Sequence, residues 1–182
     1  MHRSLLFCGI FAYTTSMQSE HTVQYVKTLL AVAVWMYCMG IVFNPGEWHF
    51  IDNVNLIFHE AGHYVFFFLG EYVQVAGGSL MQLLIPLVVF FHLYKTEQRY
   101  SAYLVLFWLG QSFINVSIYA GDAQKMELPL LGGSAVIHDW YYLLSHAGVL
   151  HLTPYIANTI FGVGFTFFFV ALYFSLFEVW KE

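Results

Sequence analysis

The residues with the clearest chemical potential are His59, Glu60 and His63, which form the sequence HEAGH. Residues four apart on a helix lie on one face, so His59 and His63 can present both imidazoles to a single metal ion. Glu60 lies about 100° around the helix from His59, where its carboxylate can reach a water molecule beside the metal. This H-E-x-x-H spacing predicts Zn2+ as the cofactor and Glu60 as the catalytic general base.

The setting of this motif is unusual, because residues 53–70 read NVNLIFHEAGHYVFFFLG and are apolar enough to lie in a bilayer. Ionisable side chains at membrane depth are costly and by default indicate a functional site. The alternative is a structural cluster whose polar side chains join helices through hydrogen bonds. The spacing and the apolar setting together favour the metal site.

The composition predicts an all-α integral membrane protein. The chain has 182 residues, of which 59% are hydrophobic and only 9% are charged, whereas about a quarter of a soluble domain is charged. Membrane lipid is therefore an expected partner. The net charge of −5 and the scattered Lys and Arg residues argue against nucleic acid.

Apolar runs and breaks predict a compact bundle of about four to five membrane segments. A full span needs about 20 apolar residues, and the runs fall at residues 23–43, 53–70, 79–94, 101–120 and 155–180. Asp52 or Asn53 is expected to cap the HEAGH helix. The sequence EYVQVAGGS is expected to end it, and Pro86 to kink the next segment.

Two regions are distinguished along the chain. Residues 1–22 have a basic start and a short apolar run, the outline of a signal peptide, although a ragged terminus before a later start at Met17 is slightly favoured. Residues 23–182 are expected to form a single membrane-embedded domain. Its location is predicted to be multi-pass, and the small size favours a bacterial inner membrane.

The basic residues favour one topology. If residues 53–94 make only one net crossing, the cytoplasmic side gathers Arg3, Lys27, Lys95, Arg99 and Lys181. One of the two segments in that range would then be re-entrant. The alternative is two ordinary crossings, which places Lys95 and Arg99 outside.

A catalytic zinc site needs a third protein ligand. The candidates are Asp122, His138, Asp139, His146 and His151. The pair His138 and Asp139, at the start of a predicted short helix over residues 140–150, is favoured over Asp122. One of the pair would bind the metal and the other would orient a ligand, although Asp139 could instead serve as a helix cap.

A H-E-x-x-H motif in an apolar segment, followed by a second motif before a later membrane helix, resembles the site-2 protease family of intramembrane zinc metalloproteases. In that family the third ligand is an aspartate in a Pro-Leu-Asp-Gly-like motif. Here LPLLGG, residues 128–133, carries Leu131 at that place, so the resemblance transfers the role to Asp139, the nearest downstream carboxylate. Asn115 could correspond to the family's asparagine, although the intervening proline is absent.

The resemblance implies a divergent zinc metalloprotease that cleaves a membrane-embedded protein or peptide segment. A helical peptide bond is shielded, so the AGGS sequence at residues 76–79 is a candidate edge for docking an unwound substrate strand. Control would come from a regulatory membrane partner.

Two other functions remain open. Nine histidines suggest a di-iron membrane oxidoreductase, although no H-x-x-H-H occurs. A non-catalytic membrane protein would use HEAGH structurally. Gln111, Ser112 and Asn115 form a polar stripe, and Gln82 is similar. We expect these four side chains to hydrogen-bond between helices more than to bind substrate.

Overall fold

The computed structural model describes residues 2–131 and 137–181, with side chains from Gln18 onward except Ser19. All regular structure in these residues is helical. The helices are α1 (His2–Phe43), α2 (Phe50–Val65), α3 (Glu71–Lys95), α4 (Arg99–Gly121), α5 (Asp139–His146) and α6 (Thr153–Trp180), with short 3-10 turns η1 (Phe67–Leu69), η2 (Asp122–Gln124) and η4 (Leu150–Leu152). Helix α1 continues through residues 22 and 23 without a break.

Four of these helices are long and apolar enough to cross a membrane. The candidate spans are Glu20–Phe43, Glu71–Lys95, Arg99–Gln124 and Leu150–Trp180. They include the segments predicted at residues 23–43, 79–94, 101–120 and 155–180. The chain is therefore an all-α, multi-pass membrane protein, as its composition predicts.

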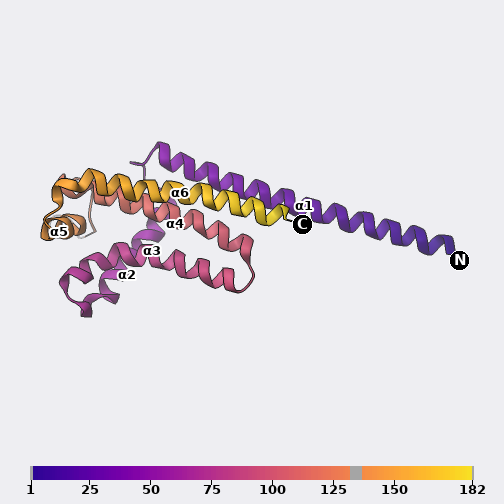
Figure 1. Ribbon diagram of the computed structural model, residues 1–182, viewed down its shortest axis with the longest axis horizontal. Coiled ribbons are helices and arrows are strands. Elements are labelled where there is room, and N and C mark those ends of the chain that lie inside the picture. The colour runs from indigo at the N-terminus through magenta and orange to yellow at the C-terminus, as the bar shows by residue number, and fades with distance from the viewer. Residues whose placement is uncertain (1, 132–136, 182) are drawn as a thin grey trace.

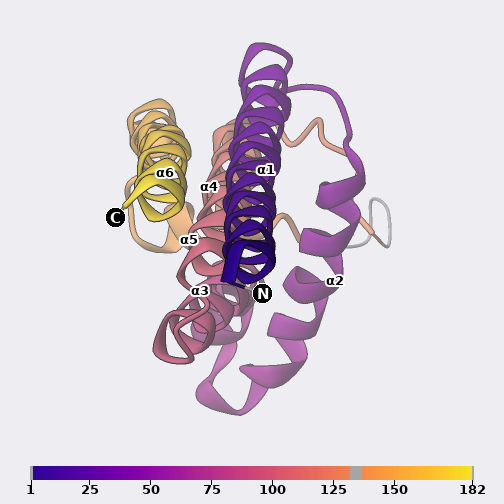
Figure 2. The ribbon, with the colours of Figure 1, turned by 90° about the vertical axis from the view of Figure 1, so that its right-hand side faces the viewer.

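Helix α4 lies at the centre of the bundle. Helix α6 packs along one side of it and α2 lies on the other, with α3 beside both α2 and α4 (Figures 1 and 2). The contact between α4 and α6 is close at Gly110 and Gly164, where a Cβ on Gly110 would lie 2.9 Å from the Gly164 carbonyl oxygen. Small residues allow such backbone approach, which drives helix association in lipid.

The connection between α2 and α3 differs from the prediction. The sequence EYVQVAGGS does not end a helix but forms the first part of α3, and Pro86 lies buried within the same continuous helix. The turn comes earlier, at Gly70, whose φ of 92° is in the left-handed region that favours glycine. Gly77 instead serves packing, because a Cβ there would lie 2.8 Å from the Gly62 carbonyl oxygen. The expected docking strand at AGGS is therefore wrong, since this sequence is helical and packed against α2.

Helix α2 begins earlier than predicted. Its N-cap is His49, and Asp52 lies inside the first turn, where its Oδ2 accepts the His49 backbone N–H at 2.7 Å. The faces of α2 are also inverted relative to a soluble helix. Its buried residues are Asp52, Asn55, His59 and Gly62, while Phe50, Ile57 and Tyr64 are 81%, 67% and 79% exposed. An apolar outer face and a polar inner face suit a helix surrounded by lipid.

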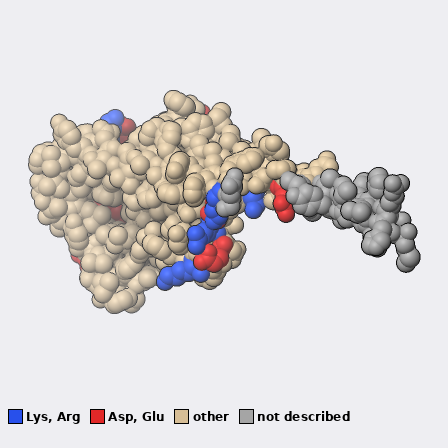
Figure 3. Space-filling view, turned by 45° about the vertical axis from the view of Figure 1, so that its right-hand side comes forward, with Lys and Arg blue, Asp and Glu red and all other residues tan. Residues whose placement is uncertain are grey.

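Basic side chains gather at one end of the bundle (Figure 3). Lys95 and Arg99 flank the connection between α3 and α4, and Lys181 follows α6. Lys27 of α1 joins them, because the Tyr100 hydroxyl donates to the Lys27 carbonyl at 2.6 Å. The remaining described basic residue, Lys125, follows η2 at the opposite end of α4.

Candidate metal centre

Three side chains that could bind a metal meet where α2, α3 and α5 come together. His59 and His63 lie one turn apart on α2, with ring centroids 4.9 Å apart. Asp139, the first residue of α5, places Oδ2 at 2.9 Å from His59 Nε2 and at 3.2 Å from His63 Nε2. All three ligand atoms lie within 4.8 Å of one another, so this group could hold a metal ion.

The dimensions of the group fit a small cation. Ligands about 2.0–2.1 Å from a tetrahedral zinc ion lie about 3.3 Å from one another, close to the two distances from Asp139. Gly78 of α3 keeps the space beside both histidines open, since a Cβ there would lie 2.6 Å from His59 Nε2 and 2.7 Å from His63 Nε2. Two imidazoles and a carboxylate are donors that zinc accepts, and three protein ligands are the usual number at a catalytic zinc site.

The orientation of the His63 ring is fixed by a hydrogen bond at Nδ1, the nitrogen that does not face Asp139. Its Nδ1 lies 2.9 Å from the backbone carbonyl oxygen of Gln74, in the first turn of α3. A carbonyl can only accept, so Nδ1 carries a proton and the neutral ring offers Nε2 to a metal.

The electrostatics of Asp139 follow from the same contacts. Burial would raise the pKa of this carboxyl, but the hydrogen bonds from His59 and His63 outweigh burial and hold the pKa below its ordinary value. Asp139 is therefore an ionised carboxylate, the form that binds a metal. Glu60 is half-buried on the adjacent face of α2, beside this group.

His138 and Asp122 form a separate pair. His138 is the N-cap of α5, and its Nδ1 accepts the Tyr141 backbone N–H at 3.3 Å. Its Nε2 lies 3.3 Å from Asp122 Oδ2, and the Asp122 carboxylate also accepts the backbone N–H groups of Glu127 and Leu128. Burial lowers the pKa of His138, against the opposing effect of Asp122. Of the three candidates Asp122, His138 and Asp139, the structure brings only Asp139 to His59 and His63. The N-cap of α5 is His138 and not Asp139.

The other candidate ligands lie elsewhere. His146 and His151 are exposed, and His146 Nδ1 lies 2.8 Å from the Tyr142 carbonyl oxygen in its own helix. Among the residues whose side chains the structure describes, His59, His63 and Asp139 form the single group with metal-binding geometry. The described histidines therefore do not make the clustered pairs that a di-iron site requires.

Tyr119 of α4 is a site residue that sequence reasoning missed. Its ring meets the His59 ring edge-on, with centroids 5.6 Å apart, and its hydroxyl oxygen accepts the Asp139 backbone N–H at 3.1 Å. The signal that could have found it is its place one turn beyond Asn115, on the polar face of α4.

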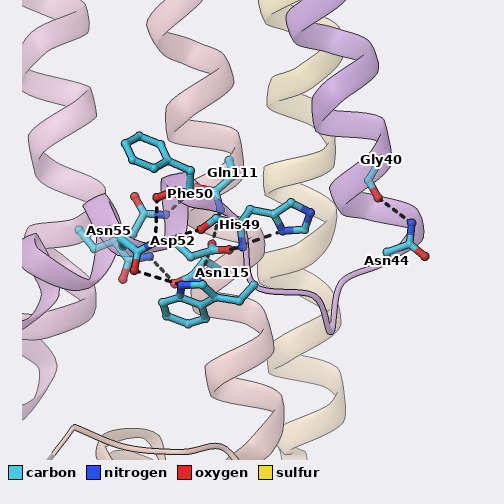
Figure 4. A network of polar contacts seen from close by, with 11 residues as sticks. Gly40, Asn44, His49, Phe50, Asp52, Asn55, Gln111 and Asn115 are labelled. Carbon is cyan, nitrogen blue, oxygen red and sulfur yellow. Dashed lines mark hydrogen bonds and ion pairs between the residues drawn. The ribbon is translucent and has the colours of Figure 1, made fainter.

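The polar stripe of α4 holds α2 in place, as the sequence predicts (Figure 4). Asp52 Oδ1 accepts Gln111 Nε2 at 2.6 Å and Asn115 Nδ2 at 2.9 Å. Asn55 donates to Gln111 at 2.5 Å and accepts from Ser112 at 3.1 Å. These bonds pin the helix one to two turns before His59, on the same face, and so fix the direction in which His59 and His63 point.

The network also includes Gln82, the remaining polar residue singled out from the sequence. Gln82 of α3 donates to the Asn115 side-chain oxygen at 2.7 Å, so the Asn115 amide is engaged on both sides between helices. Leu131 is 58% exposed, and Gly132 and Gly133 of the LPLLGG sequence lie outside the described residues.

A comparison with protein-family models, curated proteins and solved structures finds no match.

Proposed function

We propose that this chain is a zinc-dependent intramembrane hydrolase, most simply a metalloprotease of the site-2 protease kind. The observation that carries the proposal is the meeting of His59 and His63 with Asp139, 80 residues beyond His59. Gly78 also keeps any side chain of α3 away from both Nε2 atoms, as a bound ion would require. The carboxylate of Glu60, in a membrane-embedded helix, also has its simplest explanation in catalysis.

The roles follow from the geometry. His59, His63 and Asp139 would hold the ion, and a bound zinc ion would polarise the scissile carbonyl and lower the pKa of water to about 7. Glu60 takes a proton from the attacking water while the water oxygen forms a bond to the carbonyl carbon. Glu60 then returns this proton to the amine nitrogen as the C–N bond breaks.

The membrane arrangement that best fits the charges has α1, α3, α4 and α6 as crossings. Helix α2 has 16 residues, about 24 Å at 1.5 Å per residue, which is shorter than a hydrocarbon core of about 30 Å. It would be re-entrant, with its apolar outer face in lipid. The end that holds Lys27, Lys95, Arg99 and Lys181 would be cytoplasmic, and the start of α5 would lie nearer the opposite face.

The substrate would be a membrane-embedded peptide segment that unwinds locally before cleavage, because a helical peptide bond is hydrogen-bonded and shielded. With AGGS inside α3, the site itself must receive the unwound segment. Control by a regulatory membrane partner stays a prediction.

Metal content of the detergent-purified protein tests the first part of the proposal. We expect about one zinc per chain, lost in a His59→Ala variant, because a catalytic site keeps three protein ligands. Two irons per chain would favour the oxidoreductase instead. A folded protein that holds no metal, and takes up no zinc on titration, would overturn the proposal.

Replacement of Glu60 by Gln tests the chemistry. Glu60→Gln should retain zinc but lose cleavage of casein in detergent by about a hundredfold or more, since general-base catalysis contributes about 10²–10⁴-fold. A variant that cleaves as fast as the original chain would exclude Glu60 as the base. A structural role for HEAGH predicts a change in stability alone.

A further inference from the structure

The hydroxyl of Tyr119 lies at the edge of the metal group without being one of its ligands. The ring is held on two sides, edge-on to His59 at 5.6 Å and against His138 at 4.4 Å between centroids. The hydroxyl oxygen accepts the backbone N–H of Asp139 at 3.1 Å. The position of the oxygen is thus fixed from α2, α4 and α5 together.

This contact leaves the hydroxyl proton for another partner. Because the oxygen accepts from Asp139 N–H, its own O–H must point away from that donor. In the described part of the chain, no side chain or carbonyl accepts it. A phenol in a partly buried site usually finds an acceptor for its proton, so a bound molecule could supply one.

We propose that the Tyr119 hydroxyl donates a hydrogen bond to the substrate carbonyl oxygen, on which negative charge builds up when water attacks. This inference rests on the proposed function and makes Tyr119 a catalytic residue beside Glu60. Donors fixed before the reaction stabilise such charge strongly, and loss of one typically lowers kcat by about 10²–10³-fold. The Asp139 N–H bond holds the hydroxyl in place without using its proton.

A simpler role would be structural. The first N–H groups of a helix lack partners within the helix, and Tyr119 satisfies the first N–H of α5. In that case the hydroxyl matters only for holding Asp139. Its removal would weaken metal binding and nothing beyond it.

Cobalt binding followed by acetohydroxamate titration separates these roles without a substrate. The metal-stripped protein in detergent is loaded with Co2+ alone, and the visible absorption of cobalt reports its affinity. Acetohydroxamate is then added, because its oxygens mimic the charged carbonyl oxygen. The chain is compared with Tyr119→Phe, which keeps the ring, and with Tyr100→Phe as a matched control. The Tyr100 hydroxyl also bonds to a backbone group, in this case as the donor to the Lys27 carbonyl at the basic end.

We expect Tyr119→Phe to bind Co2+ as the original chain does and to bind acetohydroxamate about tenfold more weakly, the loss of one hydrogen bond. Tyr100→Phe should match the original chain in both. Equal hydroxamate affinity in Tyr119→Phe, or a loss of cobalt affinity that accounts for the whole effect, would overturn the inference and leave Tyr119 as a helix cap. So would a cobalt-loaded original chain that binds no hydroxamate. An original chain that takes up no Co2+ would refute the proposed function itself.

Discussion

Gly78 of α3 faces His59 of α2 so closely that a methyl group on its Cα would lie 2.6 Å from the Nε2 atom of that histidine. The same methyl group would lie 2.7 Å from Nε2 of His63. The two nitrogens that would bind the metal thus share a space that only glycine leaves open. This relationship turns a residue outside the H-E-x-x-H motif into part of the site.

Gly78→Ala should therefore lower zinc affinity by about tenfold or more, the size of effect seen when groups around a metal site are disturbed. Elemental mass spectrometry after dialysis against a weak chelator measures the loss. Gly162→Ala is the matched control, since it is also in a membrane helix and a Cβ there meets nothing within 4 Å. Full zinc retention in Gly78→Ala would show that the ion does not lie between the histidines.

Asp139→Asn should lower zinc affinity by about a hundredfold or more, because it removes a charged ligand rather than a supporting contact. Asp122→Asn is the comparison, since Asp122 acts on the site only through His138 and the start of α5. We expect its effect on zinc affinity to be about tenfold or less. Competition with a fluorescent zinc indicator gives both affinities. A larger loss in Asp122→Asn than in Asp139→Asn would reverse the assignment of the third ligand.

Asp52→Asn should destabilise the fold by about 1–3 kcal/mol, the cost of leaving buried partners unsatisfied. The Asp52 carboxylate accepts from His49, Gln111 and Asn115, and an amide in its place turns a donor toward at least one of these donors. Thermal unfolding in detergent measures the change.

Asn53→Ala is the control for Asp52→Asn. Asn53 is the next residue of α2, but it is exposed and bonds at the surface to Trp48. Its removal should change stability by no more than about 0.5 kcal/mol. If Asp52→Asn unfolds at the same temperature as the original chain, the network does not anchor α2.

Cysteine labelling on intact cells tests which end of the bundle is cytoplasmic. In a background with Cys8 and Cys38 replaced by Ser, Thr96→Cys reports the connection between α3 and α4, and Glu127→Cys reports the opposite end of α4. Both positions are exposed. A membrane-impermeant maleimide should label Glu127→Cys and not Thr96→Cys, because the basic end is expected to be cytoplasmic. The reverse pattern would place the basic end outside the cytoplasm and would contradict the predicted orientation.

Features that depend on spacing along one helix, or on the apolar character of one segment, could be predicted from the sequence. His59 and His63 share a face because an α-helix places residues four apart together, and the structure has them side by side. The spans at residues 23–43, 101–120 and 155–180 follow from length and hydropathy. The polar stripe from Gln111 to Asn115 was also predicted to join helices, because lipid leaves such groups few other partners.

The acidic or histidine residue that completes the metal group could not be chosen from the sequence, because the choice depends on how distant helices pack. Asp122, His138 and Asp139 are close in sequence and equally able to bind metal. Their directions depend on how α5 docks, with His138 turned to Asp122 and Asp139 turned to α2. The same holds for the glycines of AGGS, since glycine permits both a turn and close helix packing. Their contacts with Gly62 and the two histidines arise from residues distant in sequence, and local patterns carry no record of such contacts.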